Sequence, residues 1–189
     1  MTSLLLAIVL GAAFGVALDR VGATNPGYII RMLNLTDLHL MKTILLAIGF
    51  SSVLMFVGLL SGIIDAGHLS VKDSYIGVFV GGILLGAGFA ISGFCPGTGL
   101  TAAATGRKDA VFFVLGGLIG AALYMGSYAW VHSTGLLDKI VGGKATLGVI
   151  AGTDYPALFA SLPGENTGIV VGIIFIAIAA VLPKRLLGK

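Results

Sequence analysis

One short stretch of the chain carries the residue types best suited to chemistry. It is the segment Ser-Gly-Phe-Cys-Pro-Gly-Thr-Gly at positions 92–99, which contains Cys95, the one cysteine of the 189-residue sequence. Gly93 and Gly97 loosen the backbone on either side of the thiol. Pro96 disfavours helical geometry at Cys95, the residue before it, while it suits the first turn of a new helix. The segment therefore predicts a broken helix, with the thiol at the N-terminus of the helix that follows.

A broken helix of this kind can bind an anion. Free backbone N–H groups beginning at Gly97 and Thr98, together with the positive end of the helix dipole, attract negative charge without a fixed cation. Thr98, Thr101 and Thr105 are spaced three and four residues apart, which puts their hydroxyls near one helix face. These hydroxyls either line a polar track or bond back to carbonyls of their own helix.

Cys95 itself has two interpretations. A lone membrane cysteine is usually a small buried apolar side chain. At a helix N-terminus, however, a thiol gains thiolate character and nucleophilicity, whereas a neutral S–H donates a weak hydrogen bond to an anion that a thiolate would repel. We favour a neutral thiol that contacts a transported anion, with no catalytic residue. The candidate substrate-binding residues are Ser92, Gly93, Cys95, Pro96, Gly97, Thr98 and Thr101.

The elements that must position this segment are membrane helices. Apolar residues make up 57% of the chain and charged residues 10%, where ordinary soluble domains have about a quarter charged. The mean hydropathy is +1.08. We predict an all-α integral membrane protein with about five transmembrane helices, near 2–18, 42–64, 75–94, 110–131 and 166–183. The connector at 133–165 either lies in the membrane interface or dips into the bilayer.

The same composition excludes other classes of protein. Basic residues occur singly or in pairs at the ends of apolar runs, as membrane anchors do, so we expect no nucleic-acid partner. The three histidines have no carboxylate or thiol spaced around them as metal ligands, and we expect no metal and no cofactor. No basic residue precedes the first apolar run, which we therefore expect to be a retained span rather than a signal peptide.

The basic residues also predict an orientation, with the N-terminus outside and the C-terminus in the cytoplasm. Alternate connections then hold eight Lys and Arg residues on the cytoplasmic side against three on the other. The eight are Arg20, Arg31, Lys42, Arg107, Lys108, Lys184, Arg185 and Lys189, and the three are Lys72, Lys139 and Lys144.

The chain contains an internal repeat within what we expect to be a single membrane domain over 1–189. A shift of 71 residues superimposes glycines of two spans and brings the loop Thr24-Asn25-Pro26 onto the Cys95 loop. The repeat units cover about 2–64 and 75–131, and parallel repeats with interrupted helices commonly bracket a transport pathway. A helix over 96–106 is about 16 Å long, roughly half the apolar thickness, so we expect a re-entrant helix beside a wet cavity.

At this motif the sequence resembles the YeeE/YedE family of bacterial membrane proteins, the sulfur-transport family that includes thiosulfate permeases. The residues that carry the resemblance are Gly82, Gly86, Gly88 and 92–98, then Gly106, Arg107, Asp109, Ala110, Gly116, Gly117 and Gly120, with Gly22 and 35–38 in the first unit. The resemblance implies uptake of thiosulfate or a related sulfur compound across the bacterial inner membrane. It also implies that Cys95 contacts the substrate sulfur.

The chain departs from full-length family members, which are twice as long and carry further functional cysteines. Here Thr24 stands at the position that the repeat relates to Cys95. The chain looks like a half-size member, so we expect a homo-oligomer or a second half-size membrane subunit to complete the pathway within the lipid bilayer.

Three functions are open on this evidence. We favour a permease or channel for thiosulfate-like anions, which is not an enzyme. The second is a sulfur relay, in which Cys95 accepts sulfane sulfur as a persulfide and passes it to a cytoplasmic sulfur carrier. The third is an accessory subunit whose spans scaffold a transporting partner.

Overall fold

Most of the described chain folds into helices. A computed structural model describes residues 2–140 and 142–185, so Lys189, one of the residues behind the predicted orientation, lies outside the described residues. The helices are α1 (Thr2–Arg20), α2 (Pro26–Leu33), α3 (His39–Leu60), α4 (Ile76–Ser92), α5 (Pro96–Ala104), α6 (Lys108–Ser133) and α7 (Gly164–Val181). A short 3₁₀ helix, η1 (Ala66–His68), and two strands, β1 (Thr146–Val149) and β2 (Ala157–Pro163), complete the described elements.

Five helical segments of the described chain are long and apolar enough to cross a membrane. They are Thr2–Arg20, His39–Leu60, Ile76–Ala104, Lys108–Ser133 and Gly164–Val181, and the third contains the break between α4 and α5. The predicted all-α membrane protein is therefore confirmed, and the two short strands are a minor addition. The second span ends at Leu60 rather than at 64 because Gly62 adopts φ +70° and the amide of Ile63 bonds back to the carbonyl of Gly58.

The chain divides into two compact units, which are described separately. Unit 1 consists of Met1–Leu40, Ile83–Ala129 and Pro183–Lys189, and unit 2 of Met41–Gly82 and Trp130–Leu182. The division passes through α4 and α6, so each unit combines segments from both predicted repeat units. The repeat itself stays a prediction.

Unit 1 holds the Cys95 segment on a small apolar core. Phe94, in the break, is buried together with Ala102 of α5 and Ala110 of α6. The ring of Phe94 lies 5.7 Å from the ring of Phe113, measured between centroids. A side chain at Gly99 would collide with the Phe113 ring, so the glycine lets α5 approach α6 closely. These contacts fix the start of α5 against α6.

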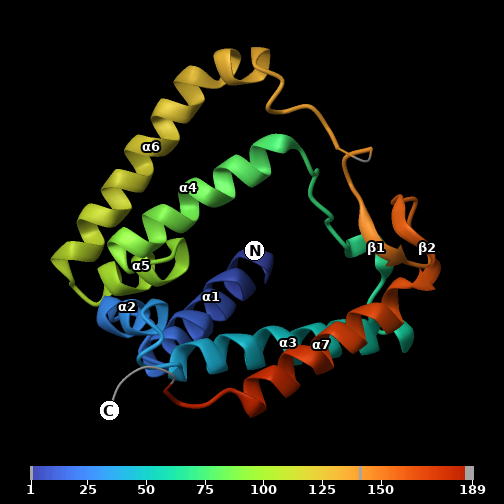
Figure 1. Ribbon diagram of the computed structural model, residues 1–189, viewed down its shortest axis with the longest axis horizontal. Coiled ribbons are helices and arrows are strands. Elements are labelled where there is room, and N and C mark those ends of the chain that lie inside the picture. The colour runs from blue at the N-terminus through green and yellow to red at the C-terminus, as the bar shows by residue number, and fades with distance from the viewer. Residues whose placement is uncertain (1, 141, 186–189) are drawn as a thin grey trace. The chain divides into compact units, whose positions relative to one another are not determined.

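Unit 2 is built on the close approach of α3 and α7, which run side by side in Figure 1. A Cβ atom on Gly49 would lie 2.6 Å from the carbonyl oxygen of Gly172, and one on Gly172 would lie 2.8 Å from that of Gly49. Small residues on facing helices permit this backbone contact in a membrane protein. Lys42 on α3 donates from Nζ to the carbonyl of Leu182, 2.8 Å away, at the C-terminal end of α7.

The connector between α6 and α7 contains the two strands. β1 and β2 pair in parallel, with Thr146 opposite Ala157 and Gly148 opposite Phe159. Gly148 also packs against Gly164 at the start of α7, where a Cβ atom would lie 3.0 Å from the Gly164 backbone. The connector is thus a strand pair attached to the start of α7, a form that neither sequence alternative specified.

Candidate functional site

The predicted broken helix lies in unit 1. α4 ends at Ser92, Gly93 adopts φ +69°, and α5 begins at Pro96. The Ser92 hydroxyl donates to the carbonyl of Gly88 and accepts a hydrogen bond from the amide of Phe94, so this side chain shapes the turn that leaves α4. Cys95 is the N-cap of α5, with φ −87° and ψ 164°.

The sulfur of Cys95 caps the short helix. The backbone N–H of Thr98 donates to Sγ at 3.4 Å, and the N–H of Cys95 donates to the Thr98 hydroxyl at 3.0 Å. This reciprocal pair is a capping box in which a thiol takes the usual place of a hydroxyl. The Thr98 amide is therefore not free, in contrast to the sequence expectation, and the Thr98 side chain is 5% exposed.

Gly97 supplies the amide that remains available at the start of α5. Pro96 has no N–H group, and the Gly99 amide donates to the carbonyl of Cys95 at 2.8 Å. Within the described part of the chain, no acceptor pairs with the Gly97 amide, and this residue is exposed. The positive end of the α5 dipole is thus presented through one residue, Gly97.

The threonines of α5 bond back to their own helix. The Thr101 hydroxyl donates to the carbonyl of Gly97 and the Thr105 hydroxyl to that of Ala102, each at 2.8 Å. Of the two sequence alternatives, back-bonding is the one found. α5 ends at Ala104, two residues earlier than predicted, because Gly106 adopts φ +85° and the Arg107 amide reaches back to the carbonyl of Ala102.

A groove of about 600 Å³ runs between α1 and α5 in unit 1. The two helices approach closely where a Cβ atom on Gly15 would lie 3.7 Å from Cγ2 of Thr101. Of the predicted site residues, Gly97 and Thr101 line this groove. Ser92, Gly93, Cys95, Pro96 and Thr98 are not part of its wall. The lining residues are Gly11, Ala12, Phe14, Gly15, Val16, Asp19, Gly97, Leu100, Thr101, Ala104 and Thr105.

The loop that the repeat relates to the Cys95 segment also caps a short helix. Asn25 is the N-cap of α2, and its side-chain oxygen accepts from the amide of Gly27 at 2.9 Å. Both short helices begin with proline directly after the cap, at Pro26 and Pro96. Asn25, rather than Thr24, therefore holds the place in α2 that Cys95 holds in α5.

The two breaks meet. A Cβ atom on Gly93 would lie 2.8 Å from Cβ of Pro26 and 3.2 Å from its carbonyl oxygen, so glycine is required for this approach. The starts of α2 and α5 lie together in Figure 1. The segments that the sequence related to each other are thus adjacent in unit 1.

Sequence reasoning missed Asp19, which lines the groove from the end of α1. Its Oδ1 accepts a hydrogen bond of 2.8 Å from the hydroxyl of Thr24, which is 8% exposed. The available signal was an acidic residue at the end of an apolar span, directly before the glycine-containing break.

The charged residues that follow α5 pair with each other. Arg107, which follows α5, forms an ion pair of 2.8 Å with Asp109 in the first turn of α6. The side-chain hydrogen bond from this guanidinium to Asp109 raises the pKa of Arg107 above its ordinary value, so the residue stays charged. Surface pairs of this kind are screened by water and salt.

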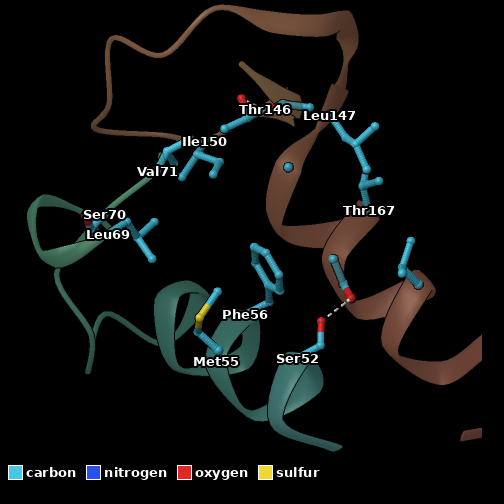
Figure 2. A pocket seen from close by; sticks show the side chains of 14 residues that line it. Ser52, Met55, Phe56, Leu69, Ser70, Val71, Thr146, Leu147, Ile150 and Thr167 are labelled. Atoms are coloured by element: carbon cyan, nitrogen blue, oxygen red, sulfur yellow. Dashed lines mark hydrogen bonds between the residues drawn. The ribbon is translucent and has the colours of Figure 1, made fainter. Parts of the chain in front are cut away.

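A second cavity, of about 580 Å³, lies in unit 2 between α3, β1, α7 and the segment at 69–71 (Figure 2). Its walls are mainly apolar, with Met55 and Phe56 on the α3 side. The hydroxyls of Ser52 and Thr167 donate to the carbonyls of Gly168 and Pro163. No charged side chain is among its described lining residues, so this cavity is less suited to an anion than the Cys95 region.

The sequence model of a family described as "Sulphur transport" matches residues 24–187. The matched range begins within the break before α2 and holds the Cys95 segment and α2 to α7, while α1 precedes it. No curated protein and no solved structure matches the chain.

Proposed function

The chain belongs to the sulphur transport family, and from this we propose that it carries thiosulfate or a related sulfur-containing anion across the membrane past Cys95. Membership of the family and the five apolar helices identify a multi-pass membrane protein that transports a sulfur compound. The choice of anion and the role of the thiol are the specific content of the proposal.

The observation that carries this proposal is the arrangement of donors around the start of α5. The exposed Gly97 amide lies at the positive end of the helix and offers a donor to the oxygens of an anion. Sγ of Cys95 accepts from the Thr98 amide and lies 3.2 Å from the Thr98 hydroxyl, and the S–H group is itself a weak hydrogen-bond donor. A weak S–H donor suits the terminal sulfur of thiosulfate, which sulfate lacks.

The contact between Gly93 and Pro26 supports a single pathway for the two breaks. It brings the positive ends of α2 and α5 to the same region of unit 1. The positive ends of the two helices attract an anion. Because the attraction comes from helix ends and not from a fixed cation, the anion is also released, as transport requires. The re-entrant position of both short helices belongs to this proposal, as do the inner membrane and the cytoplasmic C-terminus. The homo-oligomer or second half-size subunit expected from the sequence stays a prediction.

A sulfur relay is the main alternative. It requires Cys95 to act as a nucleophile and to hold a persulfide, but Sγ serves as the cap of α5 and is tied to Thr98 on two sides, at 3.4 Å to its nitrogen and 3.2 Å to its hydroxyl. Transport without covalent chemistry leaves this cap intact throughout. A persulfide detected on Cys95 by mass spectrometry after turnover would favour the relay.

The test is uptake of labelled thiosulfate and sulfate by liposomes that contain the purified chain. Cys95→Ala removes both the sulfur and the cap, whereas Cys95→Ser removes only the sulfur, because serine is a good N-cap. We expect preference for thiosulfate in the native protein and loss of that preference in both variants.

Recovery of the preference in Cys95→Ser would mean that the residue is only a cap. Equal uptake of the two anions by the native protein would reject the specificity for thiosulfate. The accessory-subunit alternative predicts no uptake at all by this chain alone.

A further inference from the structure

We propose that Asp19 couples transport to a cation, in that a proton or Na⁺ binds its carboxylate in the groove between α1 and α5 when the anion is carried. This inference rests on the proposed function, because it assumes that an anion passes the neighbouring break.

The first observation is the isolation of this carboxylate. Asp19 is the one charged residue among the described lining residues of the groove. α5 faces it with Leu100, Thr101, Ala104 and Thr105, none of which is charged. The carboxylate of Asp19 is exposed, accepts a hydrogen bond from Thr24, and has no basic side chain beside it among the described lining residues, so it can attract a cation.

The second observation is that the polar atoms of the groove wall act mainly as acceptors. The hydroxyl protons of Thr101 and Thr105 are donated to helix carbonyls, so neither hydroxyl has a proton to give to a group in the groove. Thr24 donates to one oxygen of Asp19, and the second oxygen of this carboxylate has no hydrogen-bond partner among the described residues. Carboxylate and hydroxyl oxygens are ligands for a hard cation, and a carboxylate oxygen also binds a proton.

The third observation is that the basic side chains of the neighbouring segments are not among the described residues of the groove wall. Arg20 follows Asp19 on α1 but is not part of the groove wall. Arg31 on α2 lies over the ring of Tyr28, 4.7 Å from its centroid, and Arg107 is paired with Asp109. Asp19 stands in the last turn of α1, where the partial negative charge of the helix end adds to its own. The negative charge of Asp19 therefore weakens the attraction of this region for an anion, and a cation bound to the carboxylate offsets that effect.

A continuous set of contacts links Asp19 to the thiol segment. Its carboxylate holds the buried Thr24, the next residue caps α2, and Pro26 touches Gly93 two residues before Cys95. A cation on Asp19 therefore changes the charge, and the hydrogen bond, at one end of a short packed path to the substrate region. Because coupling is reciprocal, the bound anion also strengthens binding of the cation.

The experiment measures thiosulfate uptake by liposomes that contain the full purified chain, with a proton gradient or a Na⁺ gradient imposed in separate arms. An entrapped pH dye and labelled Na⁺ report which cation enters. We expect one of the two gradients to stimulate uptake several-fold in the native protein, with entry of that cation alongside the anion.

Asp19→Asn keeps an oxygen that accepts from Thr24 but removes the charge, so it is expected to abolish stimulation, measured as the ratio of uptake with and without the cation gradient in the same variant. Asp19→Glu retains the carboxylate and should keep stimulation. Asp154→Asn, which removes an exposed acid in unit 2, is the matched control and should behave like the native protein. Retained stimulation in Asp19→Asn would overturn the inference.

Uptake by the native protein that neither gradient changes would also overturn the coupling, while the proposed anion transport would stand. Absence of thiosulfate uptake under every condition would instead reject the proposed function and the coupling with it. The cation that enters with the anion distinguishes proton coupling from Na⁺ coupling.

Discussion

Gly93 lies directly against Pro26, so close that a methyl group on Gly93 would come within 2.8 Å of the proline Cβ. This contact joins the break before α5 to the break before α2. Each residue stands at a turn that its own sequence enforces, since Gly93 has φ +69° and Pro26 opens a helix directly after its cap. The region around Cys95 therefore depends on two segments almost 70 residues apart in the chain.

Gly93→Ala is expected to destabilise unit 1 and to abolish thiosulfate uptake. The left-handed conformation at Gly93 costs an L-residue about 1–2 kcal/mol, and the overlap with Pro26 adds about 1–3 kcal/mol. Thermal unfolding of the purified protein in detergent measures the change. Gly86→Ala is the control, because no atom of the described residues lies within 4 Å of where its Cβ would be. Equal stability of the two variants would contradict the assigned contact.

Thr98→Val is expected to lower stability and thiosulfate uptake together. Valine keeps the shape of the buried threonine but leaves the Cys95 amide without its acceptor, a loss of about 1–3 kcal/mol. Thr98→Ser restores the hydroxyl and should recover most of both properties. If valine were tolerated as well as serine, the capping box would not be what holds the thiol in place.

Local residue types predicted the broken helix correctly because its causes act within a few residues. Gly93 permits a positive φ and Pro96 fixes its own φ wherever they occur, and hydropathy alone locates the five spans. The cap of α5 could have been predicted in the same way, because Cys95 and Thr98 have the spacing of a capping box, with sulfur in place of oxygen.

Contacts between distant segments were beyond sequence reasoning. In the sequence, Asp19 indicates only the end of an apolar span. It lines a groove because α5 approaches α1 in the folded chain. The pairing of β1 with β2 joins short apolar segments that carry no clear strand alternation. A shift of one residue in the repeat alignment likewise put Thr24, instead of Asn25, opposite Cys95.

Lys42→Met is expected to lower stability by about 1–3 kcal/mol without changing the preference for thiosulfate over sulfate. The lysine donates to the carbonyl of Leu182 and so satisfies the C-terminal end of α7 in unit 2, whereas the residues of the proposed anion site belong to unit 1. Lys72→Met removes an exposed lysine whose one hydrogen bond among the described residues is to the Ser70 hydroxyl, and it should change stability less. An altered anion preference in Lys42→Met would show that this residue does more than cap α7.

Gly172→Ala is expected to separate α3 from α7 and to destabilise unit 2 by about 1–3 kcal/mol. The new methyl group would lie 2.8 Å from both the carbonyl oxygen of Gly49 and Cγ2 of Val53, and the backbone on the opposite side cannot yield without moving α3. Gly116→Ala on α6 is the control, because no described atom lies within 4 Å of the added carbon and alanine favours a helix over glycine by about 1 kcal/mol. Thermal unfolding should therefore shift downward in the first variant and stay level or rise in the second. A fall of the same size in both would mean that the glycines of α6 are also packed against another helix.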